Sequence, residues 1–125
     1  MNSDALVVFG VTGDLAFKQI FPALQAMVRH GNLNVPVVGV ARSDYSLDQL
    51  RARARQSVEQ HGGADPAAFS KLCGLLRFVG GDYEDPATYG RLREALTGCQ
   101  RPLHYLAIPP SLFATVVPGL AGVGA

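Results

Sequence analysis

The chain has 125 residues, of which 48% are hydrophobic and 17% charged, and its formal net charge is +1. This is the length of one domain with enough apolar residues for a core, and the small net charge argues against a nucleic-acid partner. The two cysteines and three histidines show no metal-ligand spacing. Neither a signal peptide nor an apolar run of the ~20 residues that a membrane helix needs is evident. We therefore expect a cytoplasmic protein with no metal, nucleic acid or membrane.

The apolar run at residues 5–9 ends in two glycines, and a helical pattern follows. This predicts a strand buried on both faces of a parallel sheet, a tight turn and a helix. Gly10 and Gly13 allow the backbone to turn sharply and to approach a ligand closely. The first amides of the helix and its dipole favour an anion such as a pyrophosphate. The spacing Gly-x-x-Gly-x-x-Ala is related to the dinucleotide-binding pattern Gly-x-Gly-x-x-Gly, although a turn without a ligand remains the alternative.

Short apolar runs predict four strands, at residues 5–9, 36–41, 76–79 and 103–107. Helical patterns lie between and after them, at residues 14–30, 47–61, 66–75, 86–97 and 112–120. The first of these helices has Leu15, Ile20, Leu24 and Met27 on its core-facing side, and Pro22 predicts a kink or a fresh helix start within it.

Local signals mark the starts of the later helices. Ser46 and Gln49 have the spacing of a capping box. Asp-Pro pairs at 65–66 and 85–86 combine a cap with a proline at the first helical position. The arginines at 51, 53 and 55 are interpreted as a solvated helix face.

The alternation of strands and helices predicts an α/β fold, a Rossmann-like doubly wound parallel sheet with strand order 3-2-1-4. The ligand crevice of such a sheet lies at the carboxyl ends of strands 1 and 4, where the winding reverses. A full dinucleotide fold of this type has about six strands. We therefore expect residues 1–125 to be a dinucleotide-binding domain that is incomplete at its C-terminus.

The end of the second strand bears on the choice of cofactor. An acidic residue at this point usually bonds the ribose 2′-hydroxyl of NAD, but here the strand is followed by Arg42. A guanidinium suits a 2′-phosphate by its charge and its fork of donors, which favours NADP, and Ser43 could add a hydroxyl. Two alternatives remain, that Asp44 turns toward a ribose or that Arg42 is an ordinary surface residue.

Two further segments lie at strand ends. Asp82 and Tyr83 follow the third strand, where they would border the adenine, or Asp82 is only a polar loop residue. Ala107, Ile108 and Pro109 follow the fourth strand and would flank the central part of the cofactor, or form a rigid turn. The predicted cofactor-binding residues are Gly10, Val11, Thr12, Gly13, Asp14, Leu15, Ala16, Arg42, Ser43, Asp82, Tyr83, Ala107, Ile108 and Pro109.

Three blocks of sequence carry a family resemblance. They are Phe-Gly-Val-Thr-Gly-Asp-Leu-Ala at 9–16, with Ile-Phe-Pro at 20–22, then Val-Gly-Val-Ala-Arg-Ser at 38–43 and Tyr-Leu-Ala-Ile-Pro-Pro at 105–110. With them the chain resembles the N-terminal coenzyme domain of the glucose-6-phosphate dehydrogenase family. The resemblance implies oxidation of glucose 6-phosphate at C1 to 6-phosphogluconolactone, with hydride transfer to NADP, in the pentose phosphate pathway.

The chain departs from the family pattern at two positions. The functionally important lysine of the family falls on Gln19, which is neutral, and an aromatic position after the two prolines is Phe113, which has no hydroxyl. The Glu-Lys-Pro segment of the family, and the histidine that acts as its general base, come after residue 125. We therefore expect no catalytic residue and no substrate domain in these residues, and no turnover by them alone. The resemblance leaves open a homo-oligomer formed through the second domain.

Two other functions are weighed against this one. A short-chain dehydrogenase or epimerase needs Tyr-x-x-x-Lys, but the residues four positions after the tyrosines are Gln49, Ala87, Arg93 and Pro109. A non-catalytic NADP-binding module stays open as a description of these residues.

Overall fold

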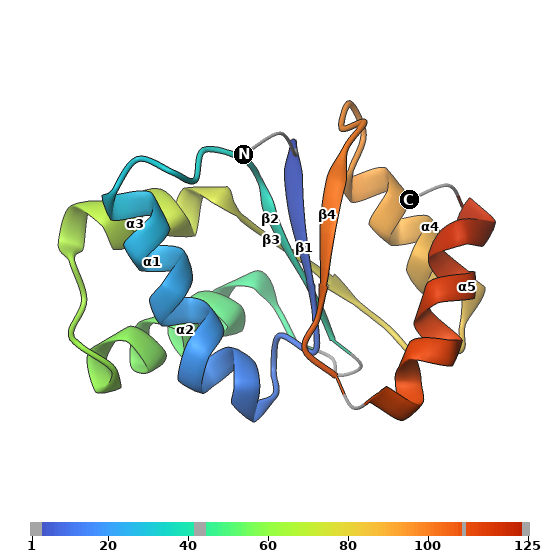
Figure 1. Ribbon diagram of the computed structural model, residues 1–125, viewed down its shortest axis with the longest axis horizontal. Helices are drawn as coiled ribbons and strands as arrows, with labels where there is room; N and C mark the ends of the chain where they lie inside the picture. The colour runs from blue at the N-terminus through green and yellow to red at the C-terminus, as the bar shows by residue number, and fades with distance from the viewer. Residues whose placement is uncertain (1–3, 42–44, 109, 124–125) are drawn as a thin grey trace.

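The computed structural model describes residues 4–41, 45–108 and 110–123, and Figure 1 shows these residues as a sheet between two layers of helices. The strands of the described part are β1 (Ala5–Phe9), β2 (Val37–Ala41), β3 (Leu76–Gly80) and β4 (Pro102–Leu106). Its helices are η1 (Ala16–Ile20), α1 (Phe21–Arg29), α2 (Leu47–Gln60), α3 (Pro66–Leu75), α4 (Pro86–Ala95), η2 (Pro110–Leu112) and α5 (Phe113–Val123). No helix within these ranges is long and apolar enough to cross a membrane.

The sheet has the order β3-β2-β1-β4, and each neighbouring pair of strands is parallel. The predicted fold class and strand order are therefore confirmed. At the carboxyl ends of the strands, Phe9 pairs with Val40 on one side and with Leu106 on the other. The carboxyl ends of β1, β2 and β4 therefore lie together at one edge of the sheet, where ligands bind in doubly wound folds.

Two apolar cores lie on the two faces of the sheet. Leu6 and Val8 of β1 belong to the core beneath α1, α2 and α3, whereas Val7 and Phe9 belong to the core beneath α4 and α5. Figure 1 shows these two sets of helices on opposite sides of the sheet. Every residue of β1 is buried, which explains why this strand reads as a continuous apolar run.

The helix after the glycine turn begins with a π-helical segment, η1, and continues as α1 with Pro22 in its first turn. The predicted kink or fresh helix start at Pro22 corresponds to this change of helix type, at a residue that has no N–H to contribute. The expectation that Leu15 packs into the core is wrong, because Leu15 is 38% exposed while Phe21 is fully buried. Leu15 precedes η1 at the exposed start of the helix, whereas Ile20, Leu24 and Met27 face the core as predicted.

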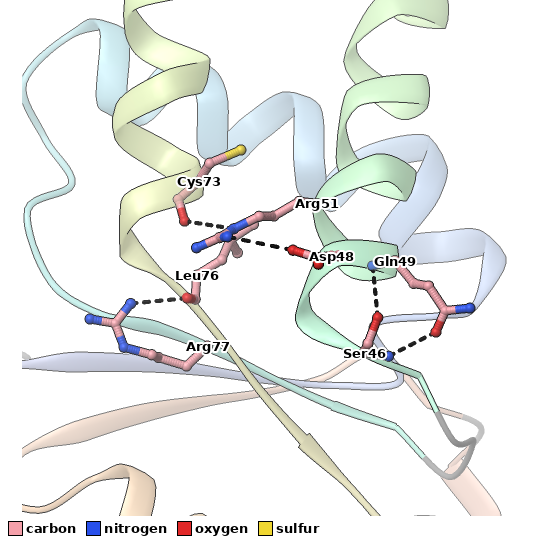
Figure 2. A network of polar contacts seen from close by, with 7 residues as sticks. All are labelled: Ser46, Asp48, Gln49, Arg51, Cys73, Leu76 and Arg77. Atoms are coloured by element: carbon pink, nitrogen blue, oxygen red, sulfur yellow. Dashed lines mark hydrogen bonds and ion pairs between the residues drawn. The ribbon is translucent and has the colours of Figure 1, made fainter.

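Helix α2 begins with the predicted capping box, in which Ser46 and Gln49 exchange hydrogen bonds (Figure 2). Arg51, expected on a solvated helix face, is partly exposed and also bonds to a neighbouring helix. Its Nε donates to the carbonyl oxygen of Cys73 over 3.2 Å, and its Nη1 lies 3.8 Å from the carboxylate of Asp48. The guanidinium therefore joins the start of α2 to the end of α3.

Candidate functional site

The glycine turn follows β1 and is held between the ends of β2 and β4. The amide of Gly10 donates to the carbonyl of Val40 over 2.9 Å, and the amide of Gly13 donates to the carbonyl of Gly10 over 2.9 Å. Gly10 has a φ of 78°, and a Cβ at this position would overlap the carbonyl oxygen of Ala107. Only glycine satisfies both constraints.

The outer side of the turn is open. Gly13, Asp14 and Leu15 are exposed, and among the described residues a Cβ on Gly13 would meet only the Gly10 carbonyl oxygen, 3.3 Å away. A ligand can therefore approach the Gly13 backbone closely, beside the start of a helix, where unpaired amides favour an anion. This arrangement fits the pyrophosphate of a dinucleotide.

The other residues predicted along the turn differ in what they offer a ligand. Val11 and Ala16 are buried in the core beneath α1, α2 and α3, so only their backbone faces the turn. Thr12 is half-buried, whereas Gln19, at the position of the family lysine, is exposed. Val11 and Ala16 can therefore contribute only backbone groups to a ligand at the turn.

Tyr83 lies beneath the turn. Its side chain is 3% exposed, and its hydroxyl oxygen accepts a hydrogen bond from the amide of Gly10 over 3.0 Å. The ring packs edge-on against Phe9, with 6.0 Å between centroids, and the Tyr89 hydroxyl donates to the Tyr83 carbonyl over 2.6 Å. The Tyr83 side chain thus supports the glycine turn from within the core, and the predicted place of this segment beside the adenine remains a prediction.

Asp82 is exposed, and its carboxylate accepts a hydrogen bond from the amide of Glu84 over 2.9 Å. This contact shapes the loop, as the alternative reading of Asp82 expected. The preceding residue, Gly81, donates to the carbonyl of Ala41 over 3.0 Å, so the loop lies next to the end of β2. A contact between Asp82 and adenine remains a prediction.

The segment after β4 lies directly beside the turn. The amide of Ala107 donates to the carbonyl of Phe9 over 3.0 Å, and Ile108 is half-buried against the core beneath α4 and α5. Both residues are therefore close to Gly10, and their contact with the cofactor remains a prediction. The predicted residues Arg42, Ser43 and Pro109, and the alternative Asp44, lie outside the described residues.

One residue at this site was missed by sequence analysis. Arg53 of α2 is only half-exposed, and its Nη2 donates to the carbonyl of Gly13 over 3.2 Å. Nothing in the sequence signals this contact, because it joins residues 40 positions apart. Within the described ranges no cluster of three or more metal-binding side chains occurs.

Comparison with known proteins decides the family. The model of the family "Glucose-6-phosphate dehydrogenase, NAD binding domain" matches residues 7–125. The chain belongs to the glucose-6-phosphate dehydrogenase family. The matched domain of this family binds a nicotinamide dinucleotide, and the Tyr-x-x-x-Lys alternative is thereby set aside.

Relatives in the glucose-6-phosphate dehydrogenase family are much longer than this chain. Glucose-6-phosphate 1-dehydrogenase 1 of Mycobacterium tuberculosis is 46% identical over 97% of the chain and 26% of its own length. A cytoplasmic enzyme of Arabidopsis thaliana is 36% identical over 90% of the chain and 24% of its own length. The chain thus spans about a quarter of the length of the curated relatives that it matches.

Solved structures of glucose-6-phosphate dehydrogenases have the same fold. The crystal structure of the Mycobacterium avium enzyme superposes with a TM-score of 0.92 and 46% identity, over 98% of this chain and 27% of that one. A glucose-6-phosphate dehydrogenase in complex with glucose 6-phosphate superposes with a TM-score of 0.84 and 29% identity, over 94% and 27% of the two chains.

Proposed function

We propose that this chain is the coenzyme-binding domain of an NADP-dependent glucose-6-phosphate dehydrogenase. The reaction is the oxidation of glucose 6-phosphate at C1 to 6-phosphogluconolactone, which feeds the pentose phosphate pathway. The observation that carries this proposal is an open glycine turn at the reversal point of the sheet, in a chain whose family model matches residues 7–125. We place the enzyme in the cytoplasm, because relatives from Arabidopsis thaliana are named as cytoplasmic.

In this proposal, backbone amides of the turn around Gly13 bind the pyrophosphate, and Ala107 and Ile108 flank the centre of the cofactor. NADP, when bound, supplies the acceptor for the hydride that leaves C1. Arg42 immediately follows the last residue of β2, Ala41. A guanidinium at the end of this strand pairs with the 2′-phosphate and selects NADP over NAD.

Residues 1–125 bind and orient the cofactor, and we assign the general base and the glucose 6-phosphate site to the remainder of the protein. The curated relatives are about four times as long as the matched region. A homo-oligomer formed through that remainder stays a prediction.

The test is made on the complete gene product that contains this chain. We expect NADPH fluorescence to change on binding, and glucose 6-phosphate to drive NADPH formation, with a higher kcat/KM for NADP than for NAD. Binding of NADPH without turnover of glucose 6-phosphate would indicate a non-catalytic NADP-binding protein. Failure to bind either nucleotide would overturn the proposal.

A further inference from the structure

Side chains of helix α2 and of its C-terminal cap residue, His61, contact the segment that follows the glycine turn. The Nη2 of Arg53 donates to the carbonyl of Gly13 over 3.2 Å, and its guanidinium carbon lies 4.8 Å from the centroid of the Phe17 ring. One turn further along the helix, the Ser57 hydroxyl donates to the carbonyl of Phe17. The ring of His61 then meets the Phe17 ring edge-on, at 5.7 Å between centroids.

The carbonyl of Gly13 is a critical acceptor in this segment. It also receives the amide of Phe17, over 3.2 Å, so it forms the first helical hydrogen bond after the turn. The residue itself is the exposed glycine over which the proposed pyrophosphate lies. A cation bound to this carbonyl therefore fixes the orientation of the peptide groups on either side of Gly13.

Stability alone does not account for the position of Arg53. Its Nε is buried and, among the described residues, has no hydrogen-bond partner. Burying an unpaired donor is unfavourable. Arg55, two residues along the same helix, instead pairs with Glu59 over 3.0 Å with its side chain 65% exposed. The position of Arg53 against Phe17 and Gly13 therefore carries a desolvation cost that a solvent-exposed arginine does not have.

We propose that Arg53 is a positioning residue for cofactor binding, which holds the Gly13 carbonyl so that the amides of the turn stay directed at the pyrophosphate. The Phe17 ring packs against the guanidinium and holds it in place through a cation–π contact. The inference rests on the proposed function, because it assigns Arg53 to the same nucleotide site. It requires that Arg53 act on the cofactor through the turn, without touching the sugar phosphate substrate.

The test compares Arg53→Met and Arg53→Lys in the complete gene product, with Arg55→Met as the matched control on the same helix. We expect Arg53→Met to raise the Kd for NADPH about tenfold, the effect of losing one charge-assisted hydrogen bond. Arg53→Lys should recover part of this loss, because it keeps a positive donor. The KM for NADP should rise with the Kd, while the KM for glucose 6-phosphate and the kcat at saturating NADP stay unchanged.

A parent protein that binds no NADPH would overturn the proposed function and this inference with it. If the parent binds NADPH, equal affinities of the parent and Arg53→Met would overturn the inference alone. Equal losses in Arg53→Met and Arg55→Met would also do so, since they would show only an effect of net charge. If Arg53→Met fails to fold, Phe17→Leu replaces it. This variant removes the aromatic ring that contacts Arg53 and keeps the charge of Arg53. An unchanged Kd for NADPH would overturn the inference.

Discussion

The amide of Gly10 and the phenol of Tyr83, 73 residues apart in the sequence, are joined by a hydrogen bond of 3.0 Å. The Tyr83 hydroxyl in turn lies 3.4 Å from the carbonyl of Val40, to which it donates. One buried side chain therefore connects the loop after β3 to the glycine turn and to the end of β2. The shape of the proposed phosphate site depends on this contact as well as on the glycines themselves.

Tyr83→Phe should destabilise the fold by about 1 kcal/mol, because it keeps the ring packing and removes a hydrogen-bonding group from a buried site. Urea denaturation measures this loss. Tyr105→Phe is the matched control, since Tyr105 is 45% exposed on β4. Equal midpoints for the two variants would show that the Tyr83 hydroxyl does not support the turn.

Gly10→Ala should lower stability by roughly 3 kcal/mol or more. The backbone at Gly10 is left-handed, which costs an alanine about 1–2 kcal/mol, and the added Cβ would overlap the Ala107 carbonyl oxygen. Gly31→Ala isolates the first effect, because Gly31 has a φ of 76° and no atom of the described residues lies within 4 Å of an added Cβ. Thermal unfolding of the two variants should therefore differ, and similar melting temperatures would argue against the overlap.

Gly13→Val, in contrast to Gly10→Ala, should affect cofactor binding much more than stability. Gly13 is exposed, and in the described part of the chain only the Gly10 carbonyl oxygen lies near an added Cβ, so we expect stability to fall by no more than about 1 kcal/mol. The side chain would occupy the space proposed for the pyrophosphate and abolish NADPH binding. Fluorescence titration beside thermal unfolding separates the two effects, and an unchanged Kd for NADPH would remove Gly13 from the site.

Arg42→Ala should weaken NADP binding far more than NAD binding, by about 30-fold or more, if the guanidinium pairs with the 2′-phosphate. The measurement is the ratio of the two Kd values in parent and variant. Arg55→Ala, which removes the same charge from the exposed part of α2, should leave this ratio unchanged. Losses of equal size for NADP and NAD in Arg42→Ala would defeat the assignment.

The carboxylate of Asp4 accepts the amides of Gln100 and Arg101, over 2.6 and 2.7 Å, and joins the start of β1 to the loop before β4. The hydrogen bond from Gln100, followed by that from Arg101, holds the pKa of Asp4 below its ordinary value of 3.8. A lowered pKa in the folded state adds stability above the unfolded pKa, and this stability is lost as the pH falls through the folded value.

Asp4→Asn should therefore be less stable than the parent near neutral pH, and the difference should shrink as the pH falls below about 4. Urea midpoints over this range measure the effect. Glu84→Gln, which removes a carboxylate at an exposed residue, is the control for the change in net charge. A difference between the parent and Asp4→Asn that persists at the lowest pH would contradict the role of the charged carboxylate.

The sequence by itself determined the parallel sheet, its strand order and the place of the glycine turn. These features follow from local chemistry: continuous apolar runs mark buried parallel strands, Asp-Pro pairs and a capping box start helices, and Gly10 is the residue that a left-handed turn requires. Such signals act over a few residues, so they can be recognised in the sequence without knowledge of the fold.

Only the tertiary structure decided what surrounds the turn. It directed the Tyr83 hydroxyl to Gly10, buried Val11 in the core, and brought Arg53 from an expected solvated face to Gly13. These contacts join residues tens of positions apart, and their geometry depends on how helices and loops pack over a shared sheet. Neither residue type nor spacing encodes that packing locally, which is why the supports of the site came from the structure.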